Sequence, residues 1–325
     1  MIDVSIIICT RNRASSLDRA LTSLVLMMVK ETISWEVIVV DNGSRDNTSE
    51  IVSRYFSALP IKYVMEPVAG LSHARNRGVL HARGELLCWT DDDVSVDQGW
   101  LDSYWNAAQA FPDAAVFAGQ VMPILEKPTP KWFQQNLQSE ILQSLMASRH
   151  FEETPAKISF KKNTVPYGAN FAIRLWAQKR FRYDTTLGLS PYHNRLGEEV
   201  DVVSRILKDG NTGWTVPASK VAHFIQSSRQ TRRHLWKYYK AVGETRAATL
   251  SRDLDVFNPK HDYLKQNVIL GAPVWMWRKL LFYFLRAAVF RYLRNEYLWL
   301  YNAHRAADHF GEVIFLVKNR RRKLG

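Results

Sequence analysis

The chain has 325 residues, 46% of them hydrophobic, which is enough for one large α/β domain or for two smaller units. This composition excludes disorder as the default state, and two cysteines in apolar runs exclude a disulfide scaffold and fit a reducing cytosol. The 44 Lys and Arg exceed the 31 Asp and Glu, so the net charge of +13 favours an anionic partner: nucleic acid, a phosphorylated substrate or an anionic lipid surface.

The first residues, MIDVSIIICTRNR, carry an acidic residue where a signal peptide needs a basic segment. Their apolar run is also too short to cross a bilayer. We therefore expect the protein to be mature from residue 1.

Short β-branched runs alternate with helical patterns over roughly the first 90 residues. Continuous apolar runs are typical of strands buried on both faces, and alternation with helices at this spacing predicts a parallel, doubly wound sheet. Ser15 or Ser16 is expected to cap the first helix, and Asn47 with Glu50 has capping-box spacing for the second. The expected strands are 3–9, 35–40, 61–65 and 85–90, and the expected helices are 15–28, 47–59 and 71–83.

Polar residues follow each predicted strand. In open α/β sheets, ligands bind outside the carboxyl ends of the strands. Arg11 and Arg13, after the first strand, suit a phosphate or a nucleotide, and Asp41, after the second, can accept a hydrogen bond from a base or a ribose. The four strand ends therefore predict one polar rim, formed by TRNR (10–13), DNGS (41–44), EP (66–67) and TDDD (90–93).

Three consecutive carboxylates, Asp91, Asp92 and Asp93, follow the fourth strand. A helix cap with a solvated loop, a magnesium or calcium site without substrate, and a divalent ion that bridges the protein to a diphosphate would each explain them. Hard cations prefer oxygen ligands and complete their shell with substrate phosphates, so the position at the rim favours a metal.

Residues 110–225 are less regular, with proline-containing loops and short strands, and we interpret them as the second half of the same domain. The expected organisation is a domain over 1–228 in two halves (about 1–110 and about 111–228), and a helical, basic and aromatic extension over 229–325.

Taken together, IIICTRNR, VIVVDNGSRDNT, GLSHARNRGVLHARGELLCWTDDD and GEEVDVVSRILKDG resemble the family-2 inverting glycosyltransferases, which have the nucleotide-sugar-binding GT-A fold. The resemblance covers roughly residues 3–225. It implies a bacterial-type enzyme with a central, mostly parallel sheet flanked by helices.

The resemblance implies roles for the donor side. Thr10 and Arg11 would line the nucleotide pocket, Asp41 would bond the nucleobase, and Arg75 with Asn76 would face the nucleotide or its phosphates. The aspartates take the place of the family's Asp-X-Asp motif. Asp91 would contact the ribose or metal-bound water, Asp93 would bind Mn²⁺ or Mg²⁺, and some members use the middle position, Asp92, so which aspartate binds the ion stays open.

It also implies roles for the acceptor side. Glu199 of GEEVD stands where the family has its general base, although many members have Asp there, and Glu198 and Asp201 would support it. Acidic residues also favour the first turn of a helix, which is the plain alternative for this segment. Gly168 and Asn170 would shape the pocket near the transferred sugar.

Two further segments depart from the family pattern or fit it loosely. His223 lies where several relatives place a metal or phosphate ligand, and an ordinary hydrogen-bonded histidine is the alternative. QTRRH (230–234) resembles the Gln-X-X-Arg-Trp motif of polymerising members, but His234 replaces the Trp. This departure argues against processive polymerisation and leaves Arg232 and Arg233 as candidates to reach the diphosphate.

From Trp275 to Trp299 we expect one amphipathic helix with Arg and Lys beside its apolar stripe. Its charges exclude a membrane span, and the stripe with the terminal KNRRRKLG suits an interfacial anchor on an anionic membrane; packing on the catalytic domain or across a dimer is the alternative. The stripe comprises Leu281, Phe284, Leu285, Ala288, Tyr292 and Trp299.

The sequence thus predicts a metal-dependent transferase that moves a sugar from a nucleotide-diphosphate donor, most simply a UDP-sugar, to a saccharide or lipid-linked saccharide. We expect it in the cytoplasm, peripheral at the inner face of the membrane. Its sugar, acceptor and oligomeric state stay open. A nucleotidyltransferase is disfavoured because CTRNRAS lacks glycine, and a nucleic-acid-binding protein is disfavoured by the acidic rim; intact DDD and GEEVD disfavour a non-catalytic scaffold.

Overall fold

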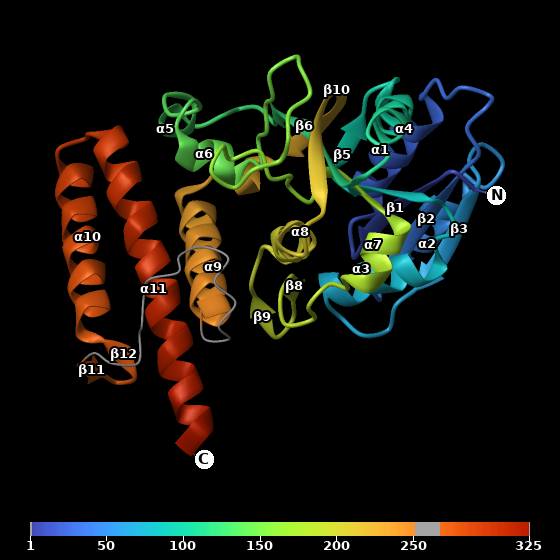
Figure 1. Ribbon diagram of the computed structural model, residues 1–325. Coiled ribbons are helices and arrows are strands. Elements are labelled where there is room, and N and C mark those ends of the chain that lie inside the picture. The colour runs from blue at the N-terminus through green and yellow to red at the C-terminus, as the bar shows by residue number, and fades with distance from the viewer. Residues whose placement is uncertain (1, 251–266, 325) are drawn as a thin grey trace. The chain divides into compact units, whose positions relative to one another are not determined.

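The computed structural model describes residues 2–250 and 267–324 and divides them into two compact units. Unit 1 comprises 1–124, 146–192 and 197–224, and unit 2 comprises 125–145, 193–196 and 225–325. Figure 1 shows the elements of both units, which are described separately below.

Unit 1 is built on an eight-stranded mixed sheet with the order β3-β2-β1-β4-β7-β6-β10-β5. The neighbours β3, β2, β1 and β4 are parallel, whereas β7 is antiparallel to both β4 and β6, and β5 is antiparallel to β10. The mixed α/β class is confirmed, and every antiparallel pair includes a strand that follows β4 in the sequence. The strands are β1 (Val4–Thr10), β2 (Trp35–Asp41), β3 (Ile61–Met65), β4 (Leu86–Asp91), β5 (Val94–Val96), β6 (Ala114–Leu125), β7 (Asn170–Arg174) and β10 (Thr212–Ile225).

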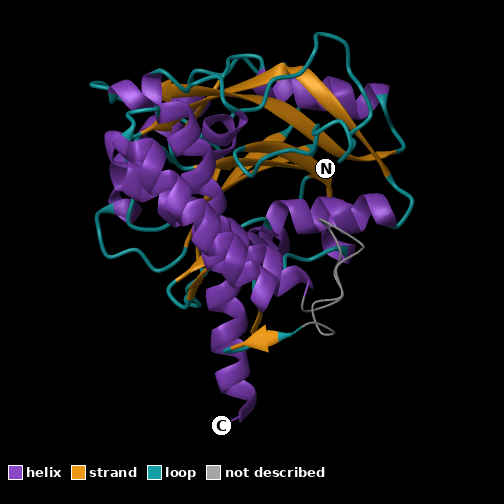
Figure 2. Ribbon diagram, turned by 90° about the vertical axis from the view of Figure 1, so that its left-hand side faces the viewer, coloured by secondary structure: helices purple, strands orange, loops and turns teal. Residues whose placement is uncertain are grey.

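Helices cover both faces of this sheet, as Figure 2 shows. Alternate residues of β1 point to opposite faces: Ile6 and Ile8 belong to one buried cluster and Ile7 to the other, and all three are fully buried. The first cluster packs against α1 (Ala14–Val25), α2 (Thr48–Ser53) and α4 (Trp100–Ala110), and the second against α3 (Leu71–His81), α7 (Leu175–Arg180) and α8 (Glu198–Lys208). Burial on both faces is what the continuous apolar runs predict.

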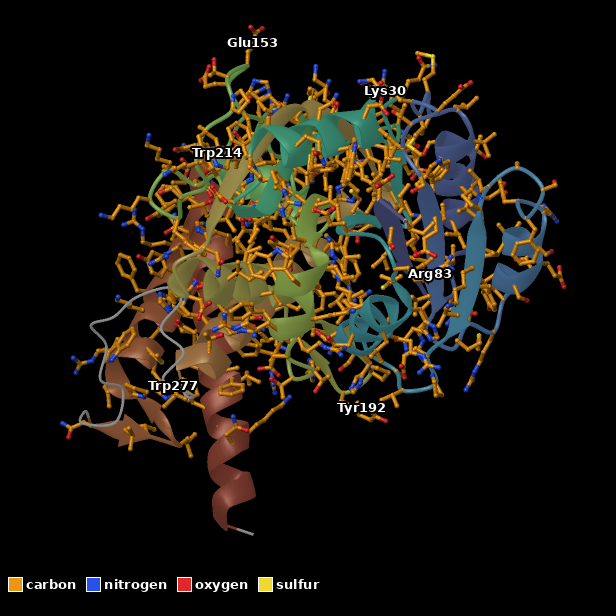
Figure 3. The ribbon with its side chains drawn as sticks, turned by 45° about the vertical axis from the view of Figure 1, so that its right-hand side comes forward. Lys30, Arg83, Glu153, Tyr192, Trp214 and Trp277 are labelled. Carbon is orange, nitrogen blue, oxygen red and sulfur yellow. The ribbon has the colours of Figure 1, made fainter. Side chains whose placement is uncertain are left out.

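The amino ends of the parallel strands are closed by a buried carboxylate. Glu36 accepts hydrogen bonds from Ser5 Oγ (2.8 Å) and from the Arg83 backbone N–H (2.9 Å) and guanidinium (2.8 Å). Arg83 is labelled in Figure 3. Protein groups thus bond one another at the amino ends of the strands. A ligand would bind at the opposite edge of the sheet, at the carboxyl ends of the strands.

Unit 2 is mainly helical. Its largest helices are α9 (Arg232–Leu250), α10 (Val274–Tyr292) and α11 (Glu296–Leu324), and α11 packs on both of the others. The single helix predicted from Trp275 to Trp299 is wrong: the chain turns at Leu293–Asn295, where Arg294 has φ +54°, and Trp299 belongs to α11. The smaller elements are α5 (Lys131–Gln134), α6 (Glu140–Leu145), the 3₁₀ turn Ser227–Arg229, β9 (His193–Asn194), β11 (Val268–Ile269) and β12 (Ala272–Pro273), and β8 (Leu189–Ser190) lies in unit 1.

Candidate active site

Three strand ends of unit 1 meet at one edge of the sheet. Register pairs Thr10 of β1 with Asp41 of β2, and it pairs Cys9 of β1 with Asp91 of β4. The polar rim expected from the sequence therefore exists at these strands. Burial raises the pKa of the Cys9 thiol to about 12. This cysteine therefore lies at the edge of the sheet as a neutral thiol.

Asp92, the middle aspartate, is held by protein groups. Its side chain is buried and accepts hydrogen bonds from Thr10 Oγ1 (2.8 Å) and Arg13 Nη1 (2.6 Å). Burial raises the pKa of Asp92 to about 6, although the charge of Arg13 opposes that rise. Thr10, Arg13 and Asp92 thus form one cluster, with the two side chains from β1 and its following loop turned toward the β4 end.

Asp93 connects this cluster to β10. Arg13 Nη1 lies 3.0 Å from its Oδ2, and His223 Nε2 lies 3.5 Å from its Oδ1. His223 Nδ1 lies 2.8 Å from the carbonyl oxygen of Met146, and because a carbonyl only accepts, Nδ1 carries a proton. In its neutral form His223 therefore presents the Nε2 lone pair to Asp93.

Asp91 is the most open of the three aspartates, with 38% of its side chain exposed. Its Oδ1 lies 3.8 Å from Nη2 of Arg75, whose side chain is only 4% exposed. The same Nη2 lies 3.5 Å from Oε1 of the buried Glu198. Arg75 therefore stands between the acidic end of β4 and the acidic start of α8.

Three aromatic rings surround Arg75. Its guanidinium carbon is 5.8 Å from the ring centre of Trp89, 5.6 Å from that of Phe171 and 5.3 Å from that of Tyr183. These rings contact a cation favourably and exclude water from around it. The charges of Glu198 and Asp91 raise the pKa of Arg75 above its ordinary value against the effect of burial, so this arginine is a permanent cation.

Glu198 and Glu199 occupy the first turn of α8, after Gly197, which has φ +83°. Glu199 Oε1 accepts a hydrogen bond from the backbone N–H of Gly168 (3.2 Å). Burial, together with the charge of Glu199, raises the pKa of Glu198 to about 7 despite the neighbouring Arg75. Asp201, the third acid of this turn, is bonded to Arg205 (2.7 Å). The site therefore contains a pair of buried, interacting carboxylates.

Asp41 is buried at the end of β2. Its Oδ1 accepts from the backbone N–H of Ser44 (2.8 Å), and its Oδ2 accepts from the Tyr63 hydroxyl (2.5 Å). Burial and the carboxylate raise the pKa of Tyr63, which keeps this hydroxyl protonated as a donor. Arg11, in contrast, is exposed on the loop after β1.

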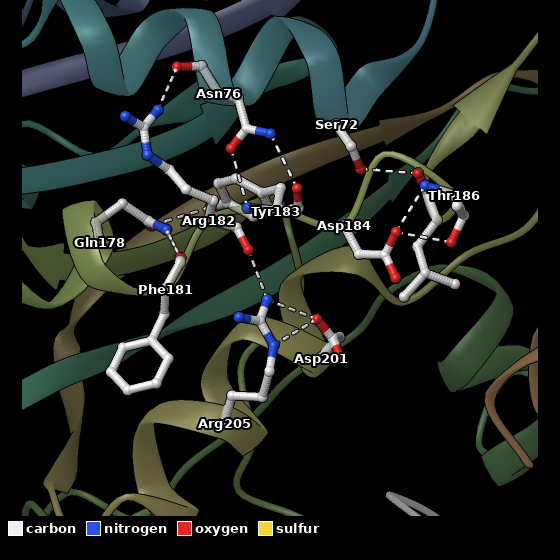
Figure 4. A network of polar contacts seen from close by, with 11 residues as sticks. Ser72, Asn76, Gln178, Phe181, Arg182, Tyr183, Asp184, Thr186, Asp201 and Arg205 are labelled. Carbon is white, nitrogen blue, oxygen red and sulfur yellow. Dashed lines mark hydrogen bonds and ion pairs between the residues drawn. The ribbon is translucent and has the colours of Figure 1, made fainter. Parts of the chain in front are cut away.

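Asn76 has partners that the sequence does not suggest. Its side-chain amide donates to the carbonyl of Tyr183 (2.9 Å) and accepts from the backbone N–H of Tyr183 (2.9 Å), as Figure 4 shows. Both ends of the amide thus fix Tyr183, whose ring contacts Arg75. The structure thus shows Asn76 supporting Tyr183, a role that the sequence did not suggest, and its contact with a nucleotide stays a prediction.

Asn170 also differs from the expectation. It is fully buried, its oxygen accepts from Trp100 Nε1 (2.8 Å) and Tyr104 Oη (2.7 Å), and its nitrogen donates to the carbonyls of Gln120 (2.8 Å) and Ser219 (3.1 Å). With two donors and two acceptors engaged, this amide ties α4 and three strands together in the core, so Asn170 does not line a sugar pocket. Gly168 does lie at the site, because a Cβ there would be 2.6 Å from Arg75 Nη2.

The candidates from the QTRRH segment belong to unit 2. Arg232 pairs with Glu296 (2.8 Å) and lies over the rings of Trp132 (5.2 Å) and Trp299 (4.8 Å), so its role within unit 2 is structural. Arg233 is exposed in the first turn of α9. The other site residues named above all belong to unit 1.

Several functional neighbours were missed by sequence reasoning. Tyr63 beside Asp41, Met146 behind His223 and the Tyr183 ring beside Arg75 come from segments without a motif, and although Trp89 lies in the GELLCWTDDD segment, nothing there indicated its contact with Arg75. Tyr63 alone had a usable signal, since it lies two residues before the end of the strand next to β2. The other contacts depend on tertiary packing.

Two of the residues expected to hold a metal ion, Asp93 and His223, lie close together. Among residues 2–250 and 267–324, no group of three or more His, Cys, Asp or Glu side chains has the arrangement of a complete metal site. The available donors are the carboxylate oxygens of Asp91 and Asp93, which are hard ligands that suit Mn²⁺ or Mg²⁺, and the imidazole of His223, a softer nitrogen ligand. His223 Nε2 and Asp93 Oδ1 lie 3.5 Å apart, and both are atoms of types that can bind a cation.

Comparison with known proteins assigns the class. The family model "Glycosyl transferase family 2" matches residues 5–177, which is more than half of the chain. The chain belongs to this family and is a glycosyltransferase. This result decides against the nucleotidyltransferase and nucleic-acid-binding alternatives.

Curated relatives share one segment with this chain. A cholesterol galactosyltransferase of Borreliella burgdorferi is 35% identical over 108 residues, which are 33% of this chain and 29% of that protein. A chondroitin synthase of Pasteurella multocida is 39% identical over 105 residues, which are 32% of this chain and 11% of that protein. The chain therefore matches less than a third of the length of these relatives.

Solved structures share the fold over nearly the whole chain. Residues 1–349 of Staphylococcus aureus TarS in complex with UDP-GlcNAc give a TM-score of 0.55 at 14% identity, covering 99% of this chain and 92% of that one. The mannosyltransferase PcManGT of Pyrobaculum calidifontis, in complex with GDP-Man and Mn²⁺, gives 0.53 at 16% identity, covering 99% and 75%. These likenesses confirm the GT-A fold.

Within the described residues, none of the helices combines the length and apolar character that crossing a bilayer requires.

Proposed function

We propose that this glycosyltransferase is inverting and moves a sugar from a UDP-sugar to a hydroxyl of a saccharide or lipid-linked saccharide in a single displacement. One observation carries the proposal: Arg75 lies within 3.8 Å of Asp91 and 3.5 Å of Glu198. A donor-side acidic cluster and an acceptor-side carboxylate pair therefore adjoin one buried cation. Single displacement needs a stabilised leaving group and a base on opposite sides of the reacting carbon.

The donor would lie along the carboxyl ends of β1, β2 and β4. Asp41, fixed by Ser44 and Tyr63, would accept a hydrogen bond from the base, and Thr10 with Arg11 would line its pocket. Arg11 is exposed and could bind a phosphate directly. Arg75 is buried and would stabilise the donor's negative charge from inside the protein. The complexes of related folds with UDP, UDP-GlcNAc and GDP-Man support a nucleotide-sugar donor.

The divalent ion, Mn²⁺ or Mg²⁺, would be held by Asp93 and His223, with Asp91 as the third side chain. When bound, it would neutralise the negative charge of the leaving diphosphate. Asp92 would orient the site instead of binding the ion, because Thr10 and Arg13 occupy its oxygens. The Mn²⁺ complex of PcManGT supports a divalent ion, and the donor set here fits one.

Glu199 would be the general base. As the acceptor oxygen forms its bond to the anomeric carbon, the bond from that carbon to the diphosphate oxygen breaks, and the hydroxyl proton passes to a Glu199 oxygen. The Gly168 N–H holds Glu199 Oε1 and leaves Oε2 for the acceptor. Glu198, with its pKa near 7, would relieve repulsion in the pair by taking a proton at neutral pH.

A panel of UDP-, GDP- and dTDP-sugars, each with Mn²⁺ and candidate saccharides, tests the donor. Release of nucleoside diphosphate identifies it, and the anomeric configuration of the product by NMR distinguishes inversion from retention. Thermal-shift binding of UDP, GDP and dTDP precedes the panel. Retention of configuration, or turnover without a divalent ion, would contradict the corresponding part of the proposal.

Two substitutions test the base and the metal ligand. Glu199→Gln is expected to lower kcat by about 10²–10⁴-fold with little change in donor binding, because it removes only the proton acceptor. Asp93→Asn is expected to weaken the apparent Mn²⁺ affinity, measured by thermal shift in UDP, by about tenfold or more. Glu153→Gln, on an exposed loop, is the matched control. Wild-type turnover by Glu199→Gln would exclude this residue as the base.

A further inference from the structure

The solvent side of α10 is apolar along most of its length. Leu281, Leu285, Val289 and Tyr292 recur at helical spacing and are 59%, 54%, 53% and 87% exposed. The opposite side packs on α11, where Tyr283 stacks on His309 and Arg286 bonds Asn302. We call the exposed side the α10 face; it also includes Phe282, Phe284 and Leu293.

Basic residues accompany this face, and acidic ones are absent from residues 267–295. Arg278 and Lys279 are exposed at the start of the helix, and Arg291 and Arg294 are exposed at its end and just after it. Arg291 has a partner in Glu296 (3.1 Å). An apolar stripe bordered by cations is the pattern of a helix that lies in an anionic lipid interface.

The β11–β12 hairpin adds to the same surface. Its turn residue Leu270 has φ +53° and is 64% exposed, and its neighbours Val268 and Ile269 are about half exposed. Trp277 of α10, labelled in Figure 3, donates from Nε1 to the Ile269 carbonyl (3.0 Å), which holds the hairpin against the start of the helix. Exposed apolar residues therefore continue from the hairpin onto the α10 face.

The charges of residues 267–295 favour an anionic membrane over a second copy of the chain as the partner of the α10 face. In a symmetric dimer the α10 face would meet its own copy, and residues 267–295 offer no acid to pair with the cations of the other copy. An anionic membrane instead offers an apolar layer for Leu281 and Leu285 below phosphates that attract the cations. α10, like the other described helices, lacks the combination of length and apolar character that spanning a bilayer requires.

We propose that the α10 face and the hairpin bind in the plane of an anionic membrane surface. This inference goes beyond the transferase reaction and does not depend on the choice of donor. It would place the enzyme where a lipid-linked acceptor is presented.

Vesicle co-sedimentation of the full chain tests the proposal, with phosphatidylcholine alone and with about 30% phosphatidylglycerol added to supply negative charge. We expect pelleting with the anionic vesicles only, and release as salt is raised. Leu281→Gln/Leu285→Gln should lower the partition coefficient about tenfold or more because it removes two inserted side chains. Arg278→Gln/Lys279→Gln should lower it by a similar factor on anionic vesicles.

Matched controls distinguish a loss of membrane binding at the α10 face from the general effect of removing exposed leucines or charges. Leu26→Gln/Leu80→Gln removes two leucines that are 61% and 60% exposed in unit 1, and Arg54→Gln/Lys62→Gln removes two exposed charges there. Both should pellet like the wild type. Equal pelleting of the α10 variants and their controls, or no pelleting at all, would overturn the proposal.

Light scattering after size exclusion addresses the competing partner. The proposal predicts the same molar mass for the wild type and Leu281→Gln/Leu285→Gln. A wild-type dimer that this variant converts to monomer would show that a second copy covers the α10 face, and would also overturn the proposal.

Discussion

Arg75 shows how one residue can serve two halves of a site. Its side chain is almost fully buried, yet it reaches Asp91 of β4 and Glu198 of α8, and three aromatic rings surround it. A buried cation of this kind is stable only while its anionic partners stay in place, since an unpaired buried charge is costly. Small displacements of Arg75 should therefore affect the donor and acceptor sides together.

Gly168→Ala tests this coupling at the smallest scale. A Cβ at residue 168 would be 2.6 Å from Arg75 Nη2, so the guanidinium must move away from its carboxylate partners. We expect kcat to fall at least tenfold while the melting temperature changes by only a few degrees, because the backbone there needs no positive φ. Gly99→Ala is the control, since nothing lies within 4 Å of its Cβ. Equal kcat in the two variants would contradict the role given to Gly168.

Glu198→Gln tests the buried carboxylate pair by its pH dependence. Because burial raises the pKa of Glu198 to about 7 in the folded protein, ionising it disfavours folding, and stability is lost as pH rises from about 4.5 through 7. The variant cannot ionise. Relative to the wild type, its free energy of unfolding should rise between pH 5 and pH 8 by about 1–3 kcal/mol. Urea unfolding at both values measures this.

The exposed Glu153→Gln supplies the control and should show no such dependence (Figure 3). A pH-independent difference between Glu198→Gln and the wild type would mean that Glu198 is not the group being titrated.

At the scale of elements, helix starts show what the sequence could and could not predict. Asn47 does precede α2, but its side chain makes no capping hydrogen bond; Asp46 accepts from Thr48 (2.5 Å from its hydroxyl) instead. The first helix begins at Ala14, before the serines expected to cap it. Asp46 also accepts a hydrogen bond from the backbone N–H of Ala14 (3.0 Å), and this bond allows the earlier start. A partner 32 residues away replaces the local cap, and no local pattern contains it.

The same contrast holds for the sheet and the site. Continuous hydrophobic runs predicted the four strands β1 to β4, because a strand that is buried on both faces must be apolar along its length. The antiparallel addition of β7, β6 and β5 depends on long-range pairing that short, irregular segments do not encode. Likewise the aspartates could be placed at a strand end, whereas the attachment of Asp92 to Arg13 required the folded chain.

Gly197 tests how α8 is positioned. At φ +83° only glycine is unstrained, and asparagine tolerates this region better than other residues. Gly197→Ala should cost about 1–2 kcal/mol in the free energy of unfolding and lower kcat, because the turn that carries Glu198 and Glu199 must shift. Gly197→Asn should retain most of both. Identical losses in the two variants would show that space, and not backbone conformation, limits this position.

At the scale of the whole molecule, the proposed chemistry lies in unit 1, and unit 2 is mainly a body of packed helices. The residues proposed for the donor, the ion and the base all belong to unit 1. Unit 2 depends on close helix contact instead. A Cβ at Gly243 of α9 would lie 1.9 Å from the Asp308 carbonyl of α11, and one at Gly311 would lie 2.0 Å from the Lys240 carbonyl.

Gly243→Ala should therefore separate the two units in an unfolding experiment. The added methyl meets backbone, which cannot turn aside as a side chain can, so α9 and α11 must move apart and the unit 2 transition should fall by several degrees. UDP should still raise the transition of unit 1, because its proposed contacts lie within that unit. Calorimetry with and without UDP measures both, and Lys237→Ala, exposed on α9, is the control. Loss of the UDP-dependent shift in Gly243→Ala alone would show that donor binding requires an intact unit 2.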